Sequence, residues 1–279
     1  MAIQVSRPRS FDRATLRGAR SGNEIAMGLR CSSRWSGHEF TAVSGNWMHA
    51  AVLGEADGVE IVCVHGLGVS HRYYLPLARE LASAGLCAVA LDLPGFGRSR
   101  GPATALGVRG LSLALAGWLR ASGREGAPLV ANSAGCQVVV DLAVHAPEAV
   151  GPLVLIGPTM DSSARNPVRQ IVRLLLDVPF ERPSVWAVFA GDYARCGLRR
   201  AWATFGHLLA DRIEDKLGGV LTTVAVVRGQ HDPIAPGRWT TFLANGLSDA
   251  FCVQVPAAGH VAQYSNPAAV ARIVVDMVS

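Results

Sequence analysis

The sequence of 279 residues lacks the features that mark membrane and secreted proteins. No apolar run reaches about 18 uncharged residues, so we expect no transmembrane helix. The N-terminal part carries arginines without a continuous apolar segment or a cleavage-like site, so we expect no secretory signal and a cytoplasmic location. Lysine is nearly absent, with Lys216 as the single example.

Motifs for metals and nucleotides are missing as well. The chain has no H-E-x-x-H, no C-x-x-C, no paired Cys/His spacing and no Walker loop. The Gly95-Phe96-Gly97 turn lacks the third glycine of a dinucleotide fingerprint. Basic residues are not clustered among aromatic ones, and the net charge is only +5, which argues against nucleic-acid binding. We therefore predict a protein that uses no metal and no cofactor.

What is present indicates a globular, reduced protein. Half of the residues are apolar, and the length allows one large domain or two small ones with a sizeable core. The cysteines show no pairing pattern, and most fall within predicted core elements, so we interpret them as free thiols. They are Cys31, Cys63, Cys87, Cys136, Cys196 and Cys252.

Short apolar runs alternate with stretches of helical spacing along most of the chain. The predicted strands are 38–44, 47–53, 59–64, 87–91, 129–132, 152–156, 222–227 and 250–255, and the predicted helices are 73–84, 106–120, 136–143, 237–244 and 267–278. Such alternation predicts an α/β fold with a doubly wound, mostly parallel sheet of eight strands. The first two strands would form an antiparallel hairpin around Gly45-Asn46.

The character of the sequence changes twice, which predicts three regions. Residues 1–37 show no clear periodicity, and we interpret them as an N-terminal extension. Residues 38–157 and 218–279 form the α/β core. Residues 158–217 are arginine-rich and helical in pattern, with prolines at 167, 179 and 183, and are predicted to form a helical lid inserted after the sixth strand.

The stretch from Leu129 to Gly135 joins an apolar run to a helix through Ser133, with small residues on both sides. A strand, a sharp turn at serine and a helix are the context of a nucleophile elbow. The usual G-x-S-x-G pattern has Ala131 at its first position here. The alternative is a serine that caps an ordinary helix.

Other polar residues follow the predicted strands at the same end. Active groups of open parallel sheets lie beyond the carboxyl ends of the strands, so we expect these side chains on one rim. They are His65, Asp92, Ser133, Asp161, Asp232 and His260.

Over roughly residues 38–279 the chain resembles the α/β-hydrolase superfamily, most closely the capped branch of esterase-like and carbon–carbon-bond hydrolases. Five separated pieces in the expected order carry the resemblance. They are His65-Gly66-Leu67-Gly68, the stretch from Asp92 to Ser99, Asn132-Ser133-Ala134-Gly135, the stretch from Gly229 to Pro233, and Gly259-His260.

The resemblance implies a catalytic triad in the order Ser, Asp, His. Ser133 would be the nucleophile, and His260 the general base that accepts its proton. Asp232 would orient the imidazole and stabilise its charged form. Asp161, after the strand before the lid, is the alternative acid. His231 is interpreted as structural, because neighbouring side chains on extended backbone point apart.

The backbone N–H groups of Ala134 and, by resemblance, Leu67 would form the oxyanion hole. Gly66 allows that backbone to approach the substrate closely. His65, Gly66 and Asn132 are predicted next to the substrate, with His65 mainly supporting the loop. The stretch from Asp92 to Ser99 is interpreted as a structural turn beneath the site.

Two groups of lid residues leave alternatives open. Apolar residues would line a pocket or form a plain lid core; they are Ile171, Val172, Leu174, Leu175, Leu176, Trp186, Phe189, Trp202 and Phe205. Arginines would bind an anionic substrate or carrier protein, or form a solvated face; they are Arg165, Arg169, Arg173, Arg195, Arg199 and Arg200.

Together these features predict a cofactor-independent serine hydrolase that cleaves a small, mostly apolar carboxylic ester through an acyl-serine intermediate. C–C bond hydrolysis, lyase or cyclase chemistry on the same scaffold is the alternative within enzymes. A non-catalytic ligand-binding protein is the alternative outside them. An unperturbed His260 would give a rate that rises through pH ~6.5.

Overall fold

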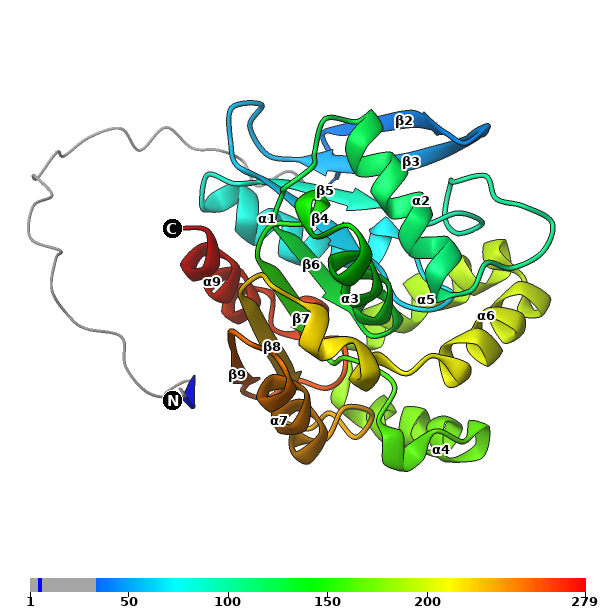
Figure 1. The fold of residues 1–279 in the computed structure, drawn as a ribbon, viewed down its shortest axis with the longest axis vertical. Helices are drawn as coiled ribbons and strands as arrows, with labels where there is room; N and C mark the ends of the chain where they lie inside the picture. The colour runs from blue at the N-terminus through cyan, green and yellow to red at the C-terminus, as the bar shows by residue number, and fades with distance from the viewer. Residues whose placement is uncertain (1–4, 7–33) are drawn as a thin grey trace, which may run out of the picture.

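One nine-stranded sheet runs through the part of the chain that the computed structural model describes, residues 5–6 and 34–279 (Figure 1). The strands are β1 (Val5–Ser6), β2 (Gly37–Val43), β3 (Asn46–Leu53), β4 (Glu60–Val64), β5 (Cys87–Leu91), β6 (Leu129–Asn132), β7 (Leu153–Ile156), β8 (Val224–Gly229) and β9 (Ala250–Val255). Their order across the sheet is β1-β9-β8-β7-β6-β4-β5-β3-β2. The eight predicted strands are β2 to β9. Most of the predicted extension at 1–37 lies outside the described residues.

Strands β5, β4, β6, β7, β8 and β9 are parallel neighbours. Strands β2, β3 and β5 pair antiparallel, and so do β1 and β9. The predicted hairpin is confirmed, but its turn is Ser44-Gly45, since Val43 pairs with Asn46. Both turn residues have positive φ, 47° and 79°, as the twist of a two-residue hairpin requires.

Helices cover both faces of the sheet because successive strand residues point to opposite sides. Val62 and Val64 of β4 join the core beneath α2 (Val108–Ala121), α3 (Ala134–His145) and α7 (Gly237–Gly246). Ile61 and Cys63 join the core beneath α1 (Leu75–Ser83) and α9 (Pro267–Val278). Strands buried on both faces explain the continuous apolar runs in the sequence.

The connection from β7 to β8 holds a helical insertion, residues 158–217. It contains η3 (Ser162–Ala164), α4 (Pro167–Asp177), η4 (Val178–Phe180), α5 (Pro183–Cys196), α6 (Leu198–Ala210) and η5 (Ile213–Gly219). Prolines open α4 and α5, where a missing N–H costs nothing. Figure 1 shows α4, α5 and α6 gathered on the side of the molecule away from the C-terminus.

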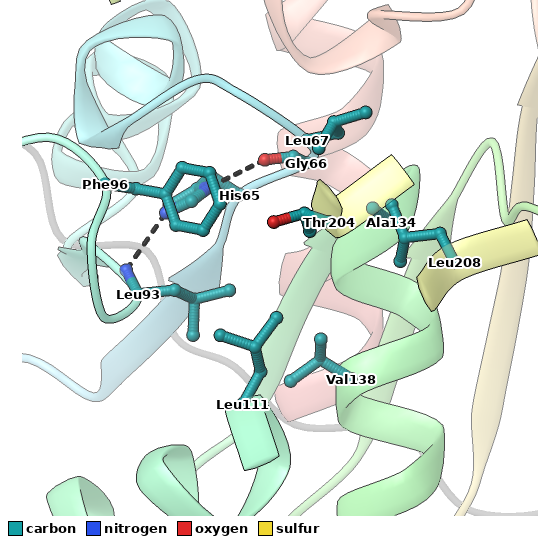
Figure 2. Close-up of a pocket in the computed structure, with 10 residues that line it drawn as sticks. All are labelled: His65, Gly66, Leu67, Leu93, Phe96, Leu111, Ala134, Val138, Thr204 and Leu208. Carbon is teal, nitrogen blue, oxygen red and sulfur yellow. Dashed lines mark hydrogen bonds between the residues drawn. The ribbon is translucent and has the colours of Figure 1, made fainter. Parts of the chain in front are cut away.

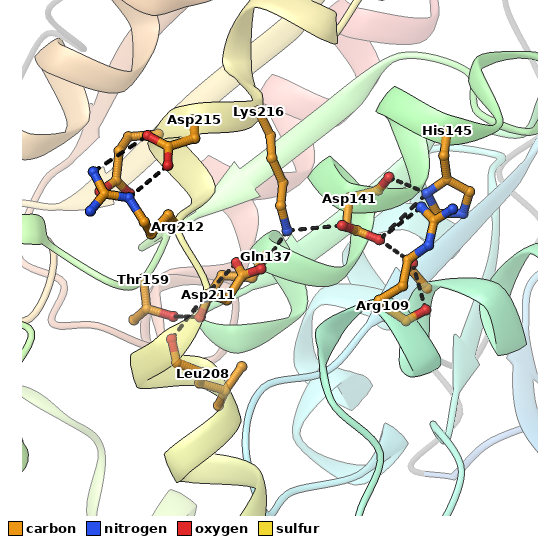
Figure 3. A network of polar contacts seen from close by, with 12 residues as sticks. Arg109, Gln137, Asp141, His145, Thr159, Leu208, Asp211, Arg212, Asp215 and Lys216 are labelled. Carbon is orange, nitrogen blue, oxygen red and sulfur yellow. Dashed lines mark hydrogen bonds and ion pairs between the residues drawn. The ribbon is translucent and has the colours of Figure 1, made fainter.

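A buried polar network ties the end of this insertion to helix α3 (Figure 3). Gln137 of α3 donates to the carbonyl of Leu208 at 3.1 Å and to Asp211 at 3.0 Å. Lys216 pairs with Asp141 at 2.9 Å and also contacts Asp211. The one lysine of the chain therefore links the insertion to the helix that follows Ser133.

The described cysteines Cys63, Cys87, Cys136, Cys196 and Cys252 are free thiols. Burial raises the pKa of the Cys136 thiol well above its ordinary value, so it stays protonated. Within residues 34–279 and 5–6, no helix has the length and apolar character needed to cross a membrane.

Candidate active site

Ser133 stands at a sharp bend between β6 and α3. Its backbone has φ 56° and ψ −122°, a combination that costs energy in a residue with a side chain. The bend is held from both sides. The Ser133 N–H donates to the carbonyl of Ile156 at 2.9 Å, and its carbonyl accepts from Cys136 at 3.0 Å. The side chain is partly exposed while its neighbours are buried, as expected of a nucleophile elbow.

Steric crowding limits the size of the residues around Ser133. A Cβ on Gly135 would lie 2.5 Å from the carbonyl oxygen of Val64 and 2.8 Å from that of His65. Ala131, in contrast, is fully buried in extended strand and pairs with Val64. Its methyl group is accommodated there, which explains the departure from the usual glycine.

His260 and Asp232 meet beside this bend. The imidazole Nδ1 lies 3.0 Å from Asp232 Oδ2, and both side chains are buried. Asp232 Oδ1 accepts the N–H groups of Ile234 at 2.8 Å and Ala235 at 2.9 Å, which fixes the carboxylate. With Nδ1 bound to Asp232, Nε2 is the ring nitrogen left for a proton from a serine.

The electrostatics of the pair favour a charged imidazole. Burial works to lower the pKa of His260, but the Asp232 carboxylate overcomes it through charge and hydrogen bonding and raises the pKa to about 9. Burial works to raise the pKa of Asp232, while His260 and the two backbone N–H groups lower it below its usual value. Asp232 is therefore ionised at neutral pH and stabilises positive charge on His260.

Gly157, directly after β7, is a site residue that sequence reasoning missed. A Cβ there would lie 2.8 Å from His260 Nδ1 and 3.0 Å from Asp232 Oδ2, and φ is +53°. The histidine and the aspartate thus pack onto bare backbone, one residue beyond the carbonyl that holds Ser133. The only signal in the sequence was a glycine at the end of a strand.

The alternative acid, Asp161, has other partners. Its Oδ2 accepts from Arg173 at 2.8 Å and from Arg238 at 2.9 Å, and its Oδ1 accepts the Ser163 N–H at 3.0 Å. Burial works to raise the pKa of Asp161, but Arg173 and the hydrogen bonds from Ser163 lower it. The structure thus places Asp232, and not Asp161, against the imidazole.

The loop 65–68 lies against Ser133. A Cβ on Gly66 would lie 3.2 Å from Ser133 Cβ and 3.7 Å from its Oγ, so a side chain at this position would crowd Ser133. Leu67 follows directly, and the tyrosine Tyr193 of α5 donates to its carbonyl at 3.1 Å. Ala134 opens helix α3, so its N–H has no partner within the helix. The two residues predicted to supply the oxyanion hole thus directly follow Ser133 and Gly66 in the chain.

His65 and Asn132 support these segments. His65 Nδ1 donates to the Gly66 carbonyl at 2.7 Å, and Nε2 accepts the Leu93 N–H at 2.9 Å. Asn132 donates to the carbonyls of Ile156 at 3.0 Å and His260 at 3.2 Å. The amide of Asn132 is thus engaged within the protein, and a role in joining loops fits its contacts better than the predicted contact with substrate.

The stretch after β5 is organised by Asp92, which is fully buried. Its carboxylate accepts from the Nδ1 atoms of His49 at 2.8 Å and His71 at 2.9 Å, and from the Arg98 N–H at 2.9 Å. Within the described residues, His49, His71 and Asp92 form the one group whose ligand atoms, all within 4.8 Å of one another, could hold a metal ion. In this structure the same atoms are joined by hydrogen bonds.

A narrow cavity opens beside Ala134 (Figure 2). The space open to the centre of a water molecule is about 10 Å³, roughly enough for one water. Its walls come from the loop 65–68, the turn after β5, α2, α3 and α6. The lining residues are His65, Gly66, Leu67, Leu93, Phe96, Leu111, Ala134, Val138, Thr204 and Leu208. Asn132 is not among them.

In α4 none of the apolar residues predicted to fill a lid core is buried, and only Val172 among them lines a pocket, an open one shared with Ser163 and Val168. Ile171, Val172 and the three leucines at 174–176 are exposed, and the buried side chains of α4 are Gln170 and Asp177. These two polar side chains are bonded within the protein, Gln170 to the Ala164 carbonyl and Asp177 to the His260 N–H. The nearby apolar wall is instead supplied by Leu208 of α6.

Several insertion arginines bind acids or carbonyls of the protein. Arg165 pairs with Glu214 at 2.7 Å, and Arg200 donates to the Pro102 carbonyl at 2.7 Å. Arg173 pairs with Asp161. These contacts favour a structural use of the three arginines over capture of an anionic partner.

Comparison with known proteins agrees with this geometry. The model of the alpha/beta hydrolase family matches residues 61–273. A Variovorax paradoxus protein named "Putative carbamate hydrolase RutD" is 26% identical over 255 residues, covering 83% of this chain and 96% of the relative. A 2-hydroxy-6-oxo-6-phenylhexa-2,4-dienoate hydrolase from Burkholderia cepacia is 26% identical over 260 residues, covering 80% and 88%. A thermophilic esterase from Thermogutta terrifontis shares the fold with a TM-score of 0.71 at 18% identity, covering 87% of this chain and 98% of that one. Because the family match spans well over half of its length, the chain belongs to the alpha/beta hydrolase family.

Proposed function

We propose that the protein is a serine hydrolase of carboxylic esters that works without a cofactor. The observation that carries the proposal is the buried His260–Asp232 pair, with Nδ1 and Oδ2 3.0 Å apart, beside a serine held in a strained bend. The three similar proteins described above are all named as hydrolases or esterases, which supports the same class of reaction.

In the proposed mechanism, Ser133 Oγ attacks the ester carbonyl carbon while His260 Nε2 takes its proton. The N–H groups of Leu67 and Ala134 donate to the oxyanion that develops on the carbonyl oxygen. The imidazolium, stabilised by Asp232, then gives its proton to the departing alkoxide. A water molecule, deprotonated by His260, attacks the acyl-serine and releases the acid.

We propose that the helices of the insertion act as a lid, as the sequence predicted for residues 158–217. The cavity beside Ala134 is too small for an acyl chain, and its outer wall is formed by Thr204 and Leu208 of α6. Movement of α6 would open an apolar slot between Leu111, Val138 and the site. A small, mostly apolar acyl group fits that lining.

The test is hydrolysis of p-nitrophenyl esters of increasing acyl length, together with labelling by a fluorophosphonate probe. We expect turnover of the short esters and labelling at Ser133, and neither in the Ser133→Ala variant. Labelling that persists in Ser133→Ala would place the nucleophile elsewhere.

Carbon–carbon hydrolysis is the second candidate, and one observation favours it: a relative with 26% identity is named as a dienoate hydrolase. The same three residues would serve that reaction. A protein that cleaves a vinylogous 1,5-diketone faster than any p-nitrophenyl ester would favour this candidate.

A further inference from the structure

Two buried carboxyl groups of the insertion hold the backbone around His260. Asp177, the last residue of α4, accepts the His260 N–H with Oδ1 at 2.9 Å. Glu181, just after η4, accepts the next N–H, that of Val261, with Oε1 at 2.6 Å. Both side chains are more than nine-tenths buried. Successive N–H groups of the loop after β9 therefore end on acids that come from about 80 residues earlier in the chain.

The fit between the two segments is close. A Cβ on Gly259 would lie 2.6 Å from Glu181 Oε1 and 2.7 Å from Asp177 Oδ1, so a side chain at this position would push the acids away. Phe180, between them, stacks on the ring of His231 with centroids 4.9 Å apart. The insertion thus contacts the residues next to His260 and the residue next to Asp232.

The contact is charged as well as close. Burial raises the pKa of Asp177, the positive charge of His260 opposes this shift, and the negative charge of Asp232 adds to it. Burial and the charge of Asp177 raise the pKa of Glu181 to about 8. The two carboxyl groups lie near each other and near Asp232, so a negative charge on one of them disfavours ionisation of the others. Glu181 Oε2 has no hydrogen-bond partner among the described residues.

We propose that Asp177 and Glu181 form a carboxyl clamp, a pair of positioning residues through which the insertion holds the His260 loop in register with Ser133. This inference rests on the proposed function, in which His260 is the general base. Asp177 and Gln170 are the buried side chains of α4, so this helix packs through polar contacts. When α4 moves outward, the His260 loop loses its two backbone hydrogen bonds to Asp177 and Glu181. The position of the lid and the position of His260 therefore change together.

The clamp accepts hydrogen bonds from the backbone of the His260 loop and places negative charge beside the imidazole. Conservative variants distinguish these two effects. Glu181→Gln keeps an acceptor for the Val261 N–H and imitates the protonated acid, whereas Glu181→Ala removes it. Asp177→Asn keeps an acceptor for the His260 N–H but removes the negative charge beside the imidazole. Asp192→Asn is the matched control, because Asp192 is an equally buried acid of the insertion that bonds to Ser70 and Arg72 instead.

Three readouts are measured on the full chain: kcat and KM for a p-nitrophenyl ester across pH, amide exchange at 260–261, and NMR titration of the His260 ring. We expect Glu181→Ala to lower kcat about 10²-fold with little change in KM, as for a base misplaced by about 1 Å, and to speed exchange of the Val261 amide. Glu181→Gln should stay within about threefold of the parent at pH 7. Asp177→Asn should move the His260 titration and the acidic limb of the rate profile about one pH unit lower, since a nearby opposite charge has been lost.

The clamp is refuted if Glu181→Ala and Glu181→Gln behave alike, or if Asp177→Asn and Asp192→Asn shift the His260 titration equally. Should Glu181→Ala not fold, the Asp177→Asn titration decides. The titration and the exchange need no substrate. A parent protein that hydrolyses no ester would therefore overturn the proposed function, while the clamp would still be judged by the NMR data.

Discussion

Replacing Asp232 with asparagine changes one atom and should stop catalysis by reversing the imidazole tautomer. Asp232 Oδ1 accepts two N–H groups, from Ile234 at 2.8 Å and Ala235 at 2.9 Å. In Asp232→Asn the amide oxygen must keep this place, because an NH₂ group cannot accept these bonds. The NH₂ group then faces His260 Nδ1, which must become an acceptor and leave the ring proton on Nε2.

The expected loss of activity follows from the position of that ring proton. Nε2 is the atom proposed to receive the proton of Ser133, and in the variant it is already occupied. A wrong tautomer in such a triad lowers kcat about 10⁴-fold, which corresponds to about 5.4 kcal/mol at roughly 1.36 kcal/mol per tenfold. The turn bonds survive the substitution, so the fold should persist, while the stability that the charged His260–Asp232 pair contributes at neutral pH is lost.

The assay is the initial rate on a p-nitrophenyl ester, with the rate of fluorophosphonate labelling measured in parallel. Asp161→Asn is the control, because Asp161 bonds to Arg173 and Arg238 and not to His260. We expect less than a tenfold loss in this control. A larger loss in Asp161→Asn than in Asp232→Asn would refute the assignment of the acid.

Four further predictions follow from the site. Because the carboxylates around His260 raise its pKa against the effect of burial, kcat/KM should rise with pH through a midpoint above the ordinary ~6.5; a midpoint at or below that value would contradict this. The same shift means that His260 contributes stability that is fully present below about 6.5 and is lost as the pH rises through the raised pKa, which denaturant unfolding at several pH values would measure. Excess EDTA should leave the rate unchanged, since only protein groups act in the proposed mechanism; loss of activity that a divalent ion restores would count against it. Gly157→Ala should lower kcat about 10²-fold by displacing the imidazole, whereas Gly123→Ala, with a similar φ of +73° but nothing within 4 Å of the new Cβ, should lose stability without losing kcat.

Much of the fold could be predicted because local patterns specify it. Strands buried on both faces must be continuous apolar runs, and β5 and β7, which are buried along their whole length, show this. The bend at Ser133 could be predicted from its small neighbours, and the structure gives the spatial reason in the carbonyls that crowd Gly135. The hairpin turn was predicted one residue too late in the chain. Ser44 adopts a positive φ, which is uncommon for serine and could not be expected from the residue type.

The insertion was harder to predict, because its helices break the usual rule for amphipathic helices. An apolar stripe normally faces the core, yet α4 exposes its leucines and buries Asp177. The local pattern does not indicate this, since Asp177 accepts the backbone N–H of His260, which lies 83 positions later in the chain. Gly157 was missed for the same reason.

The sequence by itself therefore determined the class of fold, the bend at Ser133 and the rim on which the polar residues gather, because each depends on neighbours within a few positions. Only the tertiary structure decided that His260 meets Asp232 instead of Asp161, that bare backbone at Gly157 supports the pair, and that acids of the insertion hold the loop. These are contacts between segments far apart in the chain, and their geometry exists only once the sheet has brought the strand ends together.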